Sequence, residues 1–204
     1  MRRIYSLAGV VLVIGCMDGP QTTTAPKLDG AVVTGGVSAD RKEFGDDHGE
    51  KRLILTLLTG DEEVPARPTD GHGQAHVRLS KDGTSMDFVL VANDITNITQ
   101  AHIHVAAKGV NGAIVVWLFP SVTATAALPG GGGRHDGLLA KGTFTAANFR
   151  GPLAGHPMAD LVAAIAAGNT YVNVHTDDGV APPNTGPGDF PGGEIRGQLD
   201  RNGH

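Results

Sequence analysis

The sequence contains a single cysteine, Cys16, among 204 residues. No disulfide can therefore cross-link the chain, and burial of apolar side chains must hold its fold together. Runs of Lys and Arg are also scarce, and the formal net charge is −5. Because phosphate binding requires clustered positive charge, we do not expect nucleic acid as a partner.

Hydrophobic runs long enough to cross a membrane are lacking as well. The main apolar run, Ile4 to Ile14, is well short of the roughly 20 residues that a membrane-spanning helix needs. It follows Arg2 and Arg3 and ends just before Cys16, which is the layout of a signal peptide. We therefore expect residues 1–15 to direct export and then to be removed.

The stretch Val13-Ile14-Gly15-Cys16 resembles the lipobox of bacterial lipoproteins. This resemblance implies that Cys16 is diacylated and becomes the first residue of the mature protein. Two acyl chains suffice for stable anchoring, so we expect attachment to a membrane of the bacterial cell envelope, on its extracytoplasmic side. The alternative is an ordinary secretory peptide followed by an incidental cysteine, which would give a secreted protein.

The mature chain divides into two parts. Residues 16–52 are rich in Thr, Gly, Asp and Lys and hold few large apolar side chains. Such a segment cannot bury enough apolar surface to offset its ordering entropy, and we interpret it as a flexible tether. Residues 53–200 have the composition of one folded domain of ordinary size.

Short alternating runs bounded by turn residues begin at Leu53 and predict β-strands. Asp82-Gly83 is a hairpin signal between two of them. One segment, 157–167, has helical spacing instead, with Leu161 and Ile165 on its apolar side. We therefore expect an all-β sandwich or barrel with one short helix. The eight expected strands are 53–58, 75–79, 86–92, 101–106, 113–119, 138–144, 171–176 and 194–199.

Five segments of the domain stand out, in order along the chain: 57–65, 101–104, 167–169, 171–176 and 193–199. Together they resemble the CHRD domain. This family is named after chordin, an animal inhibitor of bone morphogenetic proteins, and it also occurs in bacterial secreted proteins. The resemblance implies an immunoglobulin-like, Greek-key β-barrel with limited similarity to copper-zinc superoxide dismutases, and it implies no settled activity. We therefore expect a non-catalytic binding or structural module with an unknown protein or envelope partner.

His102 and His104 lie two residues apart in an expected strand. Side chains so spaced project from one face, about 7 Å apart along the strand, and can share a metal ion if a third ligand approaches. His175, at the end of another expected strand, is the natural candidate. Neutral imidazole suits copper and zinc, so these histidines define a possible copper or zinc site.

Copper-zinc superoxide dismutases use a similar His-x-His strand and a later strand histidine as copper ligands. Their pattern also requires a bridging histidine, further zinc ligands and a disulfide. Only His135 and His156 lie between His104 and His175 here, and no cysteine pair exists. Dismutase activity is therefore not expected.

A hydrogen-bonded network is the alternative to a metal site. Histidine donates from one nitrogen and accepts at the other, so it can tie loops together at one end of a barrel. Asn173, Glu194 and Arg196 lie in otherwise apolar strands and could join such a network. We expect the network and no cofactor, with copper or zinc binding as the alternative.

Overall fold

The computed structural model describes residues 53–200. The expected signal peptide, Cys16 and the expected tether lie outside the described residues. Within residues 53–200, no helix has the length and apolar character needed to cross a membrane.

Eight strands and one α-helix make up the described chain, which confirms the expected all-β class. Three short 3-10 helices, η2 (Gly60–Glu62), η3 (Ala146–Asn148) and η4 (Gly151–Leu153), lie in the connections. The α-helix is α1 (Met158–Ala166). The strands are β1 (Leu53–Thr59), β2 (His72–Leu79), β3 (Ser85–Thr96), β4 (Ile98–Val105), β5 (Ala113–Phe119), β6 (Arg134–Thr145), β7 (Thr170–Thr176) and β8 (Ile195–Gln198).

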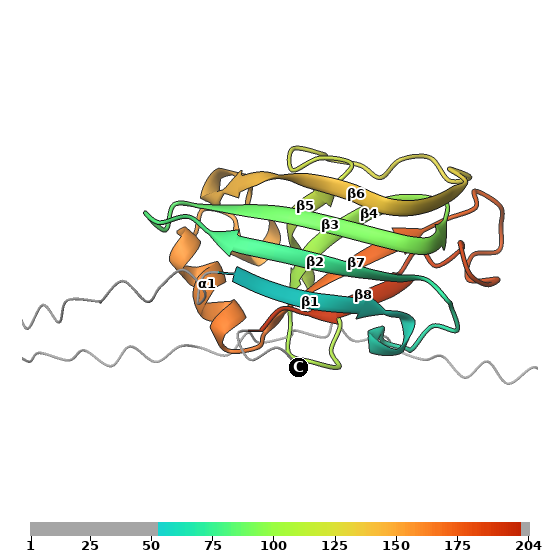
Figure 1. The fold of residues 1–204 in the computed structure, drawn as a ribbon, viewed down its shortest axis with the longest axis horizontal. Coiled ribbons are helices and arrows are strands. Elements are labelled where there is room, and N and C mark those ends of the chain that lie inside the picture. Colours follow the sequence, from blue (N-terminus) through green and yellow to red (C-terminus); the bar gives the residue numbers. More distant parts are fainter. Residues whose placement is uncertain (1–52, 201–204) are drawn as a thin grey trace, which may run out of the picture. The chain divides into compact units, whose positions relative to one another are not determined.

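The strands form one antiparallel sheet in the order β5-β4-β7-β8-β1-β2-β3-β6, which curls into a nearly closed barrel (Figure 1). After β4, β5 and β6, the chain returns so that β7 pairs with β4, which is a Greek-key connection. The two ends of the order, β5 and β6, lie beside each other without ladder hydrogen bonds. A seam therefore remains along one side of the barrel.

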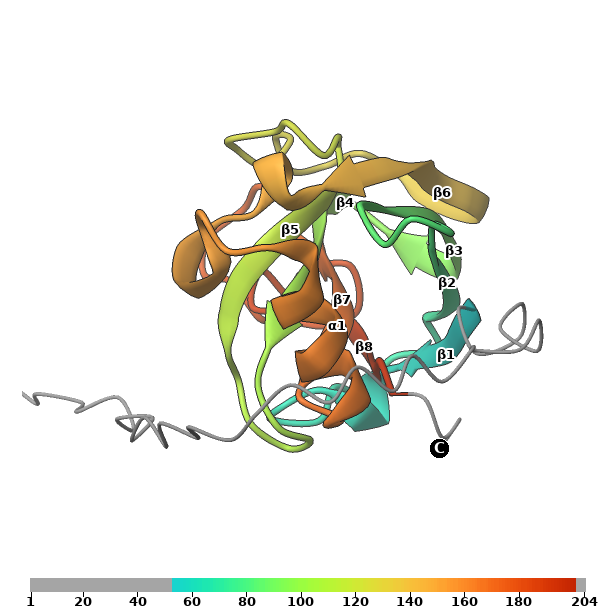
Figure 2. The ribbon, with the colours of Figure 1, turned by 90° about the vertical axis from the view of Figure 1, so that its left-hand side faces the viewer.

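The core lies inside the barrel and is built from alternate residues of the strands. The helix α1 lies across one end, as Figure 2 shows. It buries Leu161 and Ile165 against the core, as the helical spacing predicted. Each strand contributes at least one buried apolar side chain, among them Leu58, Val77, Leu90, Ile103, Val116, Phe144, Val172 and Ile195.

Strands β4 and β7 have two different faces. Ala101 and Ile103 of β4 belong to the hydrophobic core, and so does Val174 of β7. Because side chains alternate between the faces of a strand, the residues between them project from the outside of the barrel. This outer face of β4 and β7 carries the polar residues described next.

Candidate metal centre

Three histidines converge on the outer face of the barrel. His102 and His104 come from β4 and His175 comes from β7, and one ring nitrogen of each lies within 4.8 Å of the others. All three side chains are buried, with exposed fractions of 0%, 6% and 6%. The convergence expected of the two strands is present, but the group lies beneath loops on the barrel wall and not at an open end.

Backbone carbonyls fix the protonation of two of these rings. The Nδ1 atom of His175 lies 2.9 Å from the carbonyl oxygen of Pro191, and Nδ1 of His104 lies 2.9 Å from that of Gly112. A carbonyl oxygen can only accept, so each Nδ1 carries the hydrogen and each neutral ring keeps a lone pair on Nε2. The Nε2 atom of His104 is buried and has no hydrogen-bond partner among the described residues.

His102 completes the cluster. Its Nδ1 atom lies 3.2 Å from Nε2 of His175 and therefore donates to it. The Nε2 atom of His102 is then an acceptor, and it too is buried without a hydrogen-bond partner in the described part of the chain. The ring meets that of Trp117 edge-on, with centroids 4.3 Å apart, so an apolar wall closes this side of the cluster.

Burial keeps the three imidazoles neutral. Loss of hydration is the largest cause that lowers the pKa of His102 to about 2 and the pKa of His175 to about 4. Desolvation also lowers the pKa of His104, opposed by its hydrogen bond to Gly112. At neutral pH these rings carry no charge, and the neutral imidazole is the form that binds a metal ion.

A stack of side chains supports His104 from one side. The ring of Tyr171 lies parallel to that of His104, with centroids 4.6 Å apart and an interplanar angle of 7°. The guanidinium carbon of Arg196 lies 3.4 Å from the centroid of the Tyr171 ring. The Tyr171 hydroxyl accepts a hydrogen bond of 3.1 Å from the backbone N–H of Gly112. The stack therefore restrains both the imidazole and the backbone that binds it.

The polar residues expected in the network lie in two places. Asn173 adjoins the histidines, since its amide oxygen lies 3.0 Å from Nε2 of His175. Arg196 donates to Asn111 and to the carbonyl oxygen of Val110, which holds the loop between β4 and β5 over the cluster.

Glu194 lies apart from the histidines. Its carboxylate accepts from the Thr69 and Thr176 hydroxyls at 2.6 and 2.5 Å, and from the backbone N–H of Gly188 at 2.8 Å. These bonds fasten the loop between β7 and β8, which contains Pro191, to the barrel. Glu194 therefore positions His175 through the loop and not by direct contact.

Glu63 is a buried acid near the cluster that the sequence analysis did not single out. Its side chain is 5% exposed, and Oε1 has no hydrogen-bond partner among residues 53–200. Burial raises its pKa to about 7 against the opposing effects of Arg196 and Asn173. A Cβ atom on Gly193 would lie 2.3 Å from Oε1, so the glycine at 193 makes room for this carboxyl group.

Comparison with known protein families matches residues 54–199 to the CHRD domain. The match covers nearly all of the described residues, including β4, β7 and the loops over the histidines. Neither the curated proteins nor the solved structures include a match to the chain. The chain belongs to the CHRD domain family.

Proposed function

We propose that this protein is an exported lipoprotein whose CHRD domain binds a copper or zinc ion through His102, His104 and His175. The CHRD domain supports a binding or structural module. A bound transition metal gives that module a specific ligand, held on the barrel wall beneath three loops.

The buried, unpaired Nε2 atoms carry this proposal. His102 and His104 each have such an atom, and burying an acceptor without a partner costs about 1–3 kcal/mol. A metal ion bound through Nε2 of His104 uses one of these lone pairs and recovers its cost. Gly112 orients the ring of His104 through Nδ1, which is the role that outer partners of metal-bound histidines perform.

The surroundings of His175 support the same function. Its Nε2 atom is an acceptor, and the nearby oxygen of Asn173, 3.0 Å away, is an acceptor too. The amide oxygen of Asn173 is therefore placed where it could bind the same cation as His175. Three imidazoles and an amide oxygen suit Cu(II) and Zn(II), and such ligands bind Cu(II) more tightly than Zn(II). We therefore expect copper to be preferred when both ions are present.

A purely hydrogen-bonded network accounts for less of this geometry. It explains the bonds of Glu194 and Arg196, which fasten the loops. It leaves the buried nitrogens of His102 and His104 without partners. The network therefore supports the site from outside, and the histidines form the site itself.

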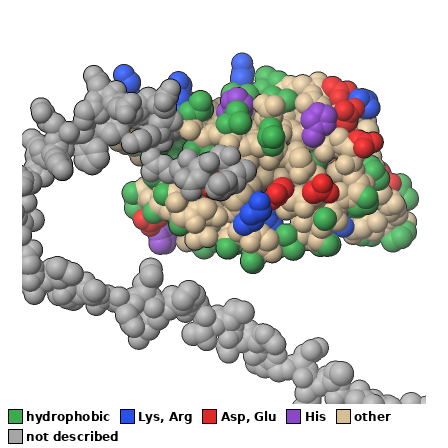
Figure 3. Space-filling view, turned by 60° about the horizontal axis from the view of Figure 1, so that its bottom comes forward, with side chains coloured by type: hydrophobic (Ala, Val, Ile, Leu, Met, Phe, Trp, Pro, Cys, Tyr) green, Lys and Arg blue, Asp and Glu red, His purple; other side chains and the backbone are tan. Residues whose placement is uncertain are grey.

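An exposed apolar surface is the feature that a protein-binding module would be expected to offer. Leu53, Leu55 and Leu57 alternate along β1 with exposed fractions of 50%, 47% and 61%. On the face shown in Figure 3, however, hydrophobic side chains are dispersed among polar and charged ones. Scattered apolar residues are normal on protein surfaces, so the histidine cluster is the more specific feature.

Export and anchoring rest on the N-terminal sequence. The apolar run ends at the single cysteine, and the four residues 13–16 fit a lipobox. Attachment through Cys16 would place the domain on the extracytoplasmic side of a bacterial membrane. A metal site there could capture ions that enter the envelope.

Thermal melts with and without metal test the metal-binding proposal. We expect one equivalent of Cu(II) at pH 7.5 to raise the thermal midpoint of the purified protein, because a ligand that binds only the folded state stabilises it. The His175→Ala variant should lose this rise. The His76→Ala variant should keep it, because His76 lies on β2 and outside the cluster. No response of the wild type to Cu(II) or Zn(II) would refute the metal site.

A further inference from the structure

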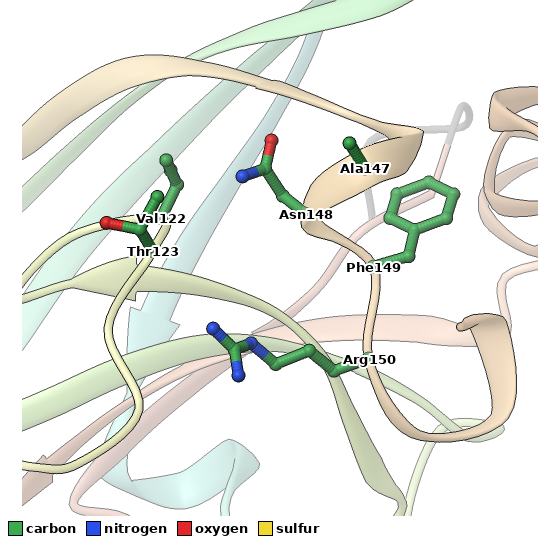
Figure 4. Close-up of a pocket in the computed structure, with 6 residues that line it drawn as sticks. All are labelled: Val122, Thr123, Ala147, Asn148, Phe149 and Arg150. Atoms are coloured by element: carbon green, nitrogen blue, oxygen red, sulfur yellow. The ribbon is translucent and has the colours of Figure 1, made fainter. Parts of the chain in front are cut away.

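We infer that a hollow at the seam of the barrel binds a small carboxylate through Arg150. This site is separate from the histidine cluster and does not depend on the function proposed above. The hollow has a volume of about 290 Å³ and is lined by Val122, Thr123, Ala147, Asn148, Phe149 and Arg150 (Figure 4). Its walls come from the loop after β5 and the segment after β6, the two strands that border the seam.

Arg150 is held in place by its backbone, while its side chain has no partner within residues 53–200. Its backbone N–H donates to the carbonyl oxygen of Val115 at 2.9 Å, which ties this segment to β5. The side chain is half-buried, and its Nε atom is fully covered without a hydrogen-bond partner in the described chain. A guanidinium group is always charged in proteins, so an unpartnered positive charge faces the hollow.

The other arginines of residues 53–200 differ from Arg150. Arg78 and Arg134 form ion pairs with aspartates, at 2.9 Å for the pair of Arg78 with Asp87. Arg67 lies over the ring of Phe190, and Arg196 binds backbone and amide oxygens. Arg150 alone among them has neither an acceptor nor a ring. Its partner is therefore expected to come from outside the described chain.

Asn148 adds a second donor to the hollow. Its amide oxygen accepts from the backbone N–H of Thr145 at 2.9 Å, which fixes the orientation of the amide. The amide nitrogen consequently points away from that bond and faces the hollow, opposite the guanidinium group of Arg150 (Figure 4). No Asp or Glu of the described residues lines the hollow. A lining with two donors and a positive charge selects an oxyanion.

The shape of the donor group and the apolar walls identify the oxyanion. The planar fork of a guanidinium matches the two oxygens of a carboxylate. Val122 and Ala147 offer apolar surface beside the donors, which suits a short hydrocarbon substituent. The volume, about 290 Å³, is at the lower limit for small-molecule pockets. The hollow therefore fits a carboxylate of a few carbon atoms.

Nuclear magnetic resonance of the purified chain tests this site with sodium butyrate as the probe, at constant ionic strength. We expect saturable shifts of the Arg150 Nε–H signal and of the Asn148 side-chain amide. In Arg150→Gln the shift of the Asn148 amide signal should disappear. In Arg150→Lys the affinity for butyrate should fall at least tenfold, because an ammonium group cannot bind both carboxylate oxygens as a planar guanidinium does. Arg78→Gln is the matched control and should bind as the wild type does.

A parallel titration with inorganic phosphate separates the two kinds of oxyanion. Butyrate should bind more tightly than phosphate if the hollow selects a carboxylate. Tighter binding of phosphate would overturn the assigned ligand class. Absence of a saturable shift with either anion, or an unchanged response in Arg150→Gln, would overturn the site.

Discussion

The Nδ1 atom of His102 lies 3.2 Å from the Nε2 atom of His175, with both rings buried on the outer wall of the barrel. The Nδ1 hydrogen of His175 is already committed to Pro191, so a single proton lies between the two rings. Any further proton would place positive charge in a desolvated site. The cluster therefore couples the stability of the domain to pH.

Acid should destabilise the domain in a defined pH range. The pKa of His175 is lowered from 6.5 to about 4 in the folded protein, so between these values only the unfolded chain takes up this proton. The contribution of the neutral His175 ring to the free energy of unfolding is complete above pH 6.5. It is lost as pH falls toward 4, by about 3 kcal/mol. Urea unfolding at pH 7.5, 6, 5 and 4 measures the slope. His175→Ala should make the slope shallower without abolishing it, because the pKa values of His102 and His104 are lowered as well. An identical slope in the variant would contradict the assigned cause.

Glu63 should have the opposite pH dependence. Its pKa is raised from 4.5 to about 7, so as pH rises through this range the unfolded chain loses the proton while the folded protein keeps it. The contribution of Glu63 to stability is thus greatest below pH 4.5 and falls by about 3 kcal/mol toward pH 7 and above. Glu63→Gln cannot ionise and should gain stability relative to wild type by that amount between pH 4 and pH 8. A constant difference in unfolding free energy would show that Glu63 titrates normally.

The helix α1 should depend on its buried apolar side. Leu161 has an exposed fraction of 0%, and Leu161→Asp would bury an unpaired charge. We expect a loss of about 3 kcal/mol or more in unfolding free energy. Ala163→Asp is the matched control on the exposed side of the same helix, where the cost should stay near 0.7 kcal/mol, about the range of helix propensities. If chemical denaturation shows equal losses of unfolding free energy in the two variants, α1 does not close the end of the barrel with its apolar side.

Membrane attachment should depend on Cys16. The Cys16→Ser variant lacks the thiol that would receive lipid, so it should remain as precursor or no longer be fixed to the membrane. Incorporation of labelled fatty acid, followed by membrane fractionation, measures the effect. Persistent labelling of the variant would refute the lipobox interpretation.

The strand pattern was predictable because it rests on local alternation. His102 and His104 share one face through the two-residue period of a strand. The expected hairpin and the expected helix are both present in the structure. We expected His175 to approach His102 and His104 from a neighbouring strand. It does so because its strand, β7, pairs with β4.

The loops that cover the histidines could not be predicted from the alternation of residues along the strands. The cover depends on three loops that contain Glu63, Gly112 and Pro191, and no periodic pattern indicates which loop residues turn inward. Glu63 follows two other acidic residues ahead of a proline, which is typical of an exposed turn. Its burial arises from contacts with segments more than 100 residues away, beside Asn173 and Gly193.

Elemental analysis of the purified protein tests the proposed metal site most directly. The protein is equilibrated with Cu(II) and Zn(II) together at pH 7.5, dialysed, and compared with a variant that combines His102→Ala and His104→Ala. The proposed site predicts close to one equivalent of metal in the wild type, mostly copper, and almost none in the variant. Equal metal content in the two proteins, or none in the wild type, would contradict it.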